Sequence, residues 1–175
     1  MADPRPLTPA EAARVLAASG ASITAGIETL PEEIAGWHSA PDEWCVKECL
    51  GHIVEAEGRG FAGRIRQILE KPGLSIMDWN QVEVQKQRGD DGRALADLVG
   101  EFASIRAESV QLVEGLQEED LAKSCEHNFV GTLRVQDLLH EWIHHDQNHH
   151  RQMQANLQAY VWQSMGNAQR FSQPH

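Results

Sequence analysis

Five of the nine histidines lie in residues 140–150, and this stretch is where metal chemistry should be sought. Neutral imidazole is a common ligand of zinc, nickel and other late first-row divalent ions. Two overlapping pairs have a four-residue spacing, which places both rings on one face of a helix. His140 and His144 form one pair, and His145 and His149 form the other. Either pair could chelate one ion.

The first pair belongs to an H-E-x-x-H motif, in which the glutamate of a zinc protease acts as base. Helix geometry argues against that function for His140, Glu141 and His144. With Leu138 at zero on a helical wheel, the apolar stripe is centred near ~30°, whereas His140 and His144 lie near ~200° and ~240°. They therefore face solvent. We interpret the motif as a coincidence, and a metalloprotease using Glu141 is a remote alternative.

The second pair lies on the apolar stripe. His149 falls near ~20° and His145 near ~340°, beside Val135, Trp142 and Met153. One such histidine is most simply read as a core residue satisfied by hydrogen bonds. Two of them, without a shared partner, would leave buried polar atoms unsatisfied, so a bound ion becomes the better interpretation.

A third ligand must come from another helix, and His52 is the best candidate. It lies on the edge of a helical face that includes Ala56 and Gly60, small residues that would let two helices approach closely. His38 and His127 lie in loops and are weaker candidates. Three imidazoles suit zinc or nickel and leave one position for water or substrate. Binding should weaken as pH falls through ~6.5, because protonated imidazole cannot ligate.

Four amphipathic segments must position these residues. Helices are expected over 9–27, 45–69, 94–116 and 132–157. Thr8 and Glu11 form a capping box for the first, although Gly20 could interrupt it, and Thr132 is the expected N-cap of the fourth. No pair of strands is expected. The predicted fold class is therefore all-α, a four-helix bundle in which residues 73–91 form a long crossover connection with at most a short helix.

Composition narrows the class of protein further. The 175 residues suit one domain, 1–175, with a polar tail over 158–175. A formal net charge of -11 argues against nucleic acid as a partner. No stretch reads as a secretory peptide or approaches the ~20 apolar residues of a membrane span, so we expect a soluble, cytoplasmic protein. The three cysteines are too few and too irregularly spaced for a disulfide framework.

Two motifs resemble the DinB-like superfamily of bacterial metal-binding four-helix bundles. The stretch Trp44–Ile53 is similar to the family's W-[ST]-x-x-E-x-x-x-H-L pattern, and the stretch His145–Gln152 is similar to its H-D-x-x-H-x-x-Q ending. The resemblance spans Leu16 to Met153. It implies a metal triad of His52, His145 and His149, and it makes a homodimer plausible. Cys45 stands where the family usually has serine or threonine.

The resemblance also implies a class of chemistry. Members include transferases and isomerases that use bacillithiol, mycothiol or glutathione. We therefore expect a divalent metal ion, a low-molecular-weight thiol as possible cofactor and a small electrophile as substrate; the alternative is a non-catalytic, structural or stress-related metal-binding protein. Asp146 and Gln152 are candidates for orienting ligands or substrate, with a solvated Asp146 equally expected. Cys49 is either an extra ligand or, more simply, a buried apolar residue.

Overall fold

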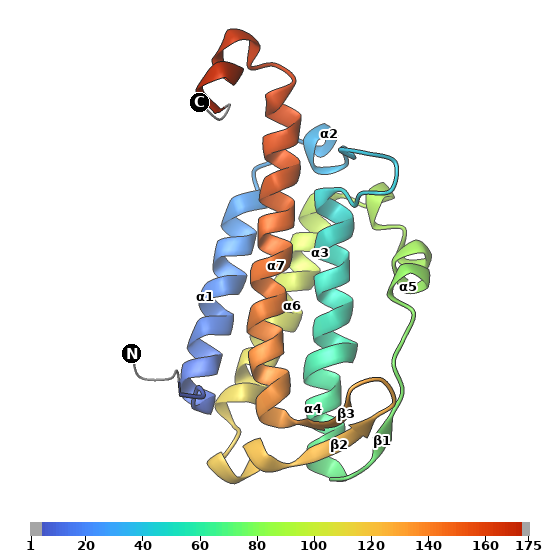
Figure 1. The fold of residues 1–175 in the computed structure, drawn as a ribbon, viewed down its shortest axis with the longest axis vertical. Helices are drawn as coiled ribbons and strands as arrows, with labels where there is room; N and C mark the ends of the chain where they lie inside the picture. Colours follow the sequence, from blue (N-terminus) through green and yellow to red (C-terminus); the bar gives the residue numbers. More distant parts are fainter. Residues whose placement is uncertain (1–4, 173–175) are drawn as a thin grey trace.

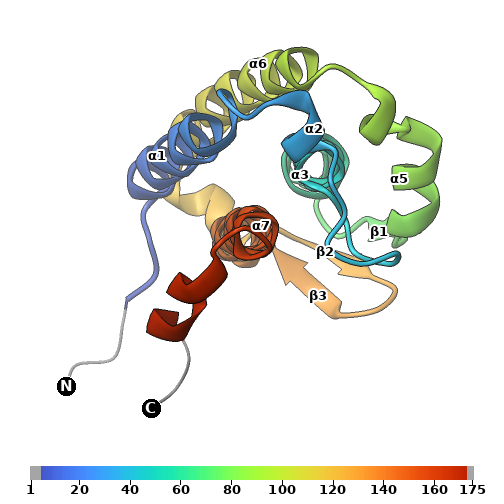
Figure 2. The same cartoon turned by 90° about the horizontal axis from the view of Figure 1, so that it is seen from above.

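A computed structural model describes residues 5–172, in which four long helical segments run side by side (Figures 1 and 2) and enclose two apolar clusters. The first is α1 (Pro9–Ile27) and the third is α6 (Leu95–Glu114). The second runs through α3 (Val46–Glu55), the π-helical turn η1 (Ala56–Phe61) and α4 (Ala62–Glu70), and the fourth is α7 (Val135–Trp162). The predicted all-α four-helix bundle is confirmed.

Helix α1 begins where the sequence indicates. Thr8 accepts a hydrogen bond from the backbone of Glu11, whose carboxylate in turn accepts the Thr8 backbone N–H. Gly20 does not interrupt the helix. A Cβ at Gly20 would lie 3.0 Å from Cγ of Arg106, so the missing side chain gives this arginine of α6 room to pass beneath α1.

The second segment departs from the prediction of one regular helix, because η1 inserts a π-helical turn. The glycines explain why the turn forms here. A Cβ at Gly63 would collide with the backbone carbonyl oxygen of Gly58, so only a bare backbone allows this winding. Such turns re-aim the side chains that follow them and recur at functional sites. Here the turn places Glu57 and Phe61 in the interior.

The expectation of no strands is wrong in one place. Strands β1 (Ser75–Ile76), β2 (Ser124–His127) and β3 (Gly131–Arg134) form a small sheet in that order, with β1 parallel and β3 antiparallel to β2. Gly131, at φ +77°, closes the three-residue loop between β2 and β3. Thr132 lies in β3 and is not the N-cap of α7; Arg134 is, and its backbone N–H donates to Asp137.

The crossover over 73–91 is more ordered than expected. It contains β1, α5 (Gln81–Arg88) and the 3₁₀ turn η2 (Asp90–Gly92). Asp90 is fully buried between Arg88 and Arg93, with N–O distances of 2.6 and 3.0 Å. A Cβ at Gly51 of α3 would overlap its carboxylate, so this glycine is what allows the crossover to dock on α3.

The remaining short elements are α2 (Glu32–Ala35), η3 (Glu118–Ala122) and η4 (Gly166–Ser172). Helix α7 extends beyond the expected 157, into the segment predicted as a polar tail, and Tyr160 packs edge-on against Trp37 at 5.4 Å. Within residues 5–172, no helix combines the length and apolar character of a membrane span.

Candidate metal centre

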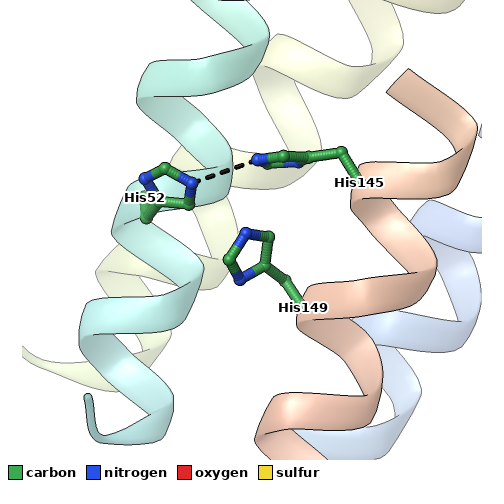
Figure 3. A group of neighbouring side chains, drawn as sticks. All are labelled: His52, His145 and His149. Carbon is green, nitrogen blue, oxygen red and sulfur yellow. Dashed lines mark hydrogen bonds between the residues drawn. The ribbon is translucent and has the colours of Figure 1, made fainter. Parts of the chain in front are cut away.

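The three predicted ligands meet inside the bundle, between α3 and α7 (Figure 3). His52 projects from α3, and His145 and His149 project from successive turns of α7. One potential ligand atom from each ring lies within 4.8 Å of the others. The Nε2 atoms of His52 and His145 are 3.0 Å apart, close to the roughly 3.3 Å that separates two nitrogens on a tetrahedral zinc ion.

The protein environment keeps these imidazoles neutral. Burial, with a smaller contribution from the neighbouring histidines, lowers the pKa of His52 to about 4 and that of His145 to about 2. Burial also lowers the pKa of His149, with Gln152 opposing the shift. A neutral ring is the form that binds metal, so the triad offers ligands well below the pH at which an ordinary histidine protonates.

The hydrogen bonds around the triad fit a bound ion. Nδ1 of His149 lies 2.9 Å from Oε1 of Gln152, so Nδ1 carries the proton and Nε2 keeps its lone pair. Nε2 of His145 is the nitrogen that faces His52, and its Nδ1 is buried without a hydrogen-bond partner among residues 5–172. The donor set therefore suits a late first-row divalent ion.

Aromatic side chains enclose the triad on three sides. Trp44 lies against His52 with ring centroids 4.9 Å apart, and Trp79 stacks on the same ring at 6.3 Å. Phe61, re-aimed by the π-turn, meets His145 edge-on at 5.2 Å. These rings shield the imidazoles from water and fix their orientation.

Two cavities open onto the triad. The sheet-side cavity, of about 510 Å³, reaches from His52 and His145 to Arg64 on α4 and His127 on β2. The Trp44 cavity, of about 340 Å³, touches all three histidines. Residues 5–172 contain other hollows, but a comparably large one, of about 550 Å³ between α1 and α7, has none of the three histidines in its wall.

The Asp146 side chain makes no hydrogen bond with the three histidines in the described structure, although its charge opposes the lowering of the pKa of His149. Fully buried beneath them, it accepts hydrogen bonds from Ser19 and from Arg106, the latter at 2.6 and 3.0 Å. Arg106 also donates to Glu57 at 2.8 to 3.0 Å. Burial raises the pKa of Glu57, and the guanidinium opposes that rise. The solvated reading of Asp146 is therefore wrong; its role is to anchor α7 to α6.

The H-E-x-x-H motif lies on the outer face of α7. The side chains of Glu141 and His144 are 61% and 67% exposed. His140 is half-buried and accepts a hydrogen bond from the backbone of Leu7 at 3.2 Å, so it holds the N-terminal approach to α1. The exposed Glu141 and His144 agree with the helical wheel, but His140 does not face solvent as predicted. The arrangement gives the protease interpretation no support.

A second group of candidate ligands, His38, Cys45 and Glu48, has a structural explanation. The Glu48 carboxylate accepts hydrogen bonds from the Cys45 backbone, from Gln85 and from His38, at 2.7 to 2.9 Å. It thereby caps α3 and ties α5 to it. Burial raises the pKa of the Cys45 thiol to about 11, which keeps it protonated.

Cys49 is fully buried in the apolar core, and burial raises the pKa of its thiol. It does not belong to the group of side chains in reach of a common ion. Of the two predictions for Cys49, the structure supports a small buried apolar residue over an extra metal ligand.

Arg64 and the role of Arg106 were not predicted from the sequence, and His127 lies in a strand, not in the loop predicted for it. An arginine on the apolar face of an amphipathic helix indicates a buried ion pair, and Arg106 does fall on the apolar face of α6. His127 alternates with the buried Cys125, which is the period of a strand. Arg64 follows His52, Ala56 and Gly60 at four-residue spacing, but the sequence alone does not show that a cavity lies above this face.

A metal-capable histidine triad inside a four-helix bundle defines the class of protein. A family model described as the DinB superfamily matches residues 6–153, and the chain belongs to that superfamily. Among solved structures, YfiT from Bacillus subtilis, described as a probable metal-dependent hydrolase with an unusual four-helix bundle topology, is similar, with a TM-score of 0.80. The alignment covers 92% of this chain and 94% of that one at 11% identity, so the likeness concerns the fold. The comparison with curated proteins gave no match.

Proposed function

We propose that the protein is a metal-dependent enzyme in which a thiol or water, activated at a divalent ion held by His52, His145 and His149, attacks a small electrophile. Zinc and nickel suit three neutral imidazoles best. Such an ion supplies a positive charge that lowers the pKa of a bound thiol or water. The observation that carries this proposal is the convergence of three neutral rings at the meeting point of two cavities.

The two cavities favour a reaction between two molecules. A low-molecular-weight thiol in the Trp44 cavity and an electrophile in the sheet-side cavity would both reach His52 and His145, which line both spaces. This is the arrangement that a thiol-dependent transferase requires. Hydrolysis is the same reaction with water as the nucleophile, and the description of YfiT supports that alternative.

The chain's own residues contribute position and shielding. Gln152 fixes the ring of His149, and Trp44 and Trp79 cover His52 on two sides. Together they would hold the histidines in place and limit the access of bulk water to the reacting atoms.

The test compares zinc-loaded and nickel-loaded protein in two assays. Turnover of chlorodinitrobenzene is measured with glutathione, bacillithiol or mycothiol, and hydrolysis of nitrophenyl acetate is measured without thiol. We expect thiol-dependent turnover that His149→Ala abolishes and that His144→Ala, on the outer face of α7, leaves unchanged. Hydrolysis alone would identify water as the nucleophile. No turnover in either assay, together with a fall in melting temperature on chelation, would instead support the non-catalytic metal-binding function.

A further inference from the structure

The sheet-side cavity has a defined length and direction. His52, Ala56, Gly60 and Arg64 follow one another at four-residue spacing along the second helical segment, and all four line the cavity. Twelve residues of helix correspond to roughly 15 to 18 Å along the axis. An occupant that reaches from the histidine triad to Arg64 must therefore be elongated.

Gly60 opens the middle of this cavity. A Cβ built on Gly60 would meet no atom within 4 Å, although the residue is buried. The absent side chain thus does not serve close packing against α7, as the sequence suggested, but leaves space for a molecule. Phe61, Trp79 and Leu133 line the same space with apolar surface.

At the end of the cavity farthest from the triad, Arg64 and His127 each have hydrogen-bond donor capacity that the protein uses weakly or not at all. The side chain of Arg64 is 14% exposed, and its one hydrogen bond in the described structure, to Asp78, is long at 3.4 Å. His127 is 5% exposed. Its Nδ1 accepts the backbone N–H of Phe129 at 3.2 Å, so the proton of the neutral ring is on Nε2. That Nε2 is buried without a partner among residues 5–172.

Three acidic side chains, Asp78, Asp137 and Glu141, also line this cavity. Asp137 is paired with Arg134 at 2.8 Å. Asp78 is 46% exposed and Glu141 is 61% exposed, so both lie at the rim of the cavity. The Nε2 of His127 is 3.9 Å from Asp78, beyond hydrogen-bond distance. The buried end thus presents donors from Arg64 and His127, and the nearest acceptor is the half-exposed Asp78, 3.4 Å from Arg64 and 3.9 Å from His127.

We propose that the sheet-side cavity binds the electrophilic substrate and that this substrate is an elongated small carboxylic acid. Its carboxylate accepts hydrogen bonds from Arg64 and His127, its apolar body lies over Gly60, and its electrophilic carbon reaches the histidine triad. A planar carboxylate matches the fork of a guanidinium, and burial strengthens such charge-assisted bonds. This assignment rests on the proposed function and specifies its substrate class.

The test uses a series of dicarboxylic acid monohydroxamates of increasing chain length. The hydroxamate group binds the metal, and the free carboxylate at the other end reaches toward Arg64. The methyl ester of each compound lacks the charge and serves as its partner probe. Dissociation constants are measured calorimetrically with zinc-loaded protein. At the matching chain length, we expect the acid to bind about tenfold more tightly than its ester, the gain from one charge-assisted hydrogen-bond pair.

Matched variants locate that preference. Arg64→Gln should remove it while leaving the affinity for the ester within about twofold, and Arg64→Lys should retain part of it. Arg66→Gln removes the same charge from an exposed position on the same helix and should leave the preference intact. His127→Phe keeps a ring but removes the donor, and it should weaken the preference. Metal content and circular dichroism of each variant verify folding.

The possible outcomes separate this proposal from the proposed function. If acid and ester bind equally at every chain length, or if Arg66→Gln removes the preference as fully as Arg64→Gln does, the carboxylate site is refuted while the metal centre stands. If neither probe binds the zinc-loaded protein, the ion has no position open to a ligand from this cavity, which refutes the proposed function and the substrate assignment with it.

Discussion

Gln152 determines which nitrogen of His149 is available to an ion. Its carbonyl oxygen lies 2.9 Å from Nδ1 and fixes the proton there, so Nε2 faces the other two rings. Partners of this kind hold a ligand's tautomer and orientation, and losing one commonly weakens metal binding by about 10- to 100-fold.

Gln152→Ala should therefore weaken zinc binding by about 10- to 100-fold without unfolding the protein. Competition with a chelating dye measures the affinity. Gln154→Ala is the matched control, because Gln154 is exposed and contacts His150, outside the triad. Equal zinc affinities in the two variants would show that the Gln152 contact does not orient His149.

Among individual residues, the histidines of the triad could be predicted from the sequence, whereas the residues that line the cavity beside them could not. The 3.6-residue period alone assigns His145 and His149 to the inner face of α7, because a long regular helix leaves little freedom. Arg64 and His127 lie 63 residues apart and meet only through the β2–β3 sheet. No local sequence pattern therefore predicts that Arg64 and His127 line the same cavity.

Four helical elements are joined by the ion network around Arg106. This side chain of α6 donates to Glu57 in η1, to Asp146 in α7 and to the backbone of Leu16 in α1. Both carboxylates are fully buried, and the guanidinium is the cation that offsets their charge. The network thereby fixes the rotation of α7, on which the direction of His145 and His149 depends.

Arg106→Met should lower the free energy of unfolding by about 3 to 5 kcal/mol, because it leaves two buried carboxylates without a cation. Urea denaturation measures this loss. Adding Glu57→Gln and Asp146→Asn should recover part of it. Arg59→Met, which breaks an exposed pair with Glu55, should cost less than about 1 kcal/mol. Similar small losses for Arg106→Met and Arg59→Met would contradict the anchoring role.

The elements that the sequence did not predict are those without a repeating pattern. The long helices show many turns of apolar periodicity. The strands have two to four residues each, too few for an alternation to stand out. The π-turn leaves the surrounding helical pattern nearly unchanged, and its only local sign is the cluster of Gly58, Gly60 and Gly63.

All three histidines of the triad come from one chain. The homodimer implied by the family resemblance stays a prediction, and metal binding in this arrangement does not depend on a second copy. The triad's low pKa values have a consequence for the stability of the metal-free protein. The folded state keeps His52 and His145 neutral, whereas the unfolded chain protonates them near pH 6.5.

The metal-free protein should therefore lose stability as the pH falls from about 6.5 to about 5. The unfolded state binds more protons in this window, since the pKa of His52 is about 4 in the folded state, against 6.5 for an unperturbed histidine. Over its full range, His52 contributes an effect of about 3 kcal/mol. Urea denaturation of chelator-treated protein across this pH range measures the slope.

His52→Asn removes one of the titrating groups and should make that slope shallower. His144→Asn, at an exposed position, is the control and should leave it unchanged. Carboxylates titrate mostly below this window and add little to it. A stability that does not change between pH 6.5 and 5 would show that the buried rings protonate freely.

The most direct test of the metal centre is elemental analysis of the purified protein beside two double variants. One variant carries His145→Ala and His149→Ala, and the other carries His140→Ala and His144→Ala. The inward triad predicts about one zinc or nickel per chain in the native protein and the second variant, and none in the first. Metal lost only from the His140→Ala, His144→Ala variant would contradict the proposed site and place the ion on the outer face of α7.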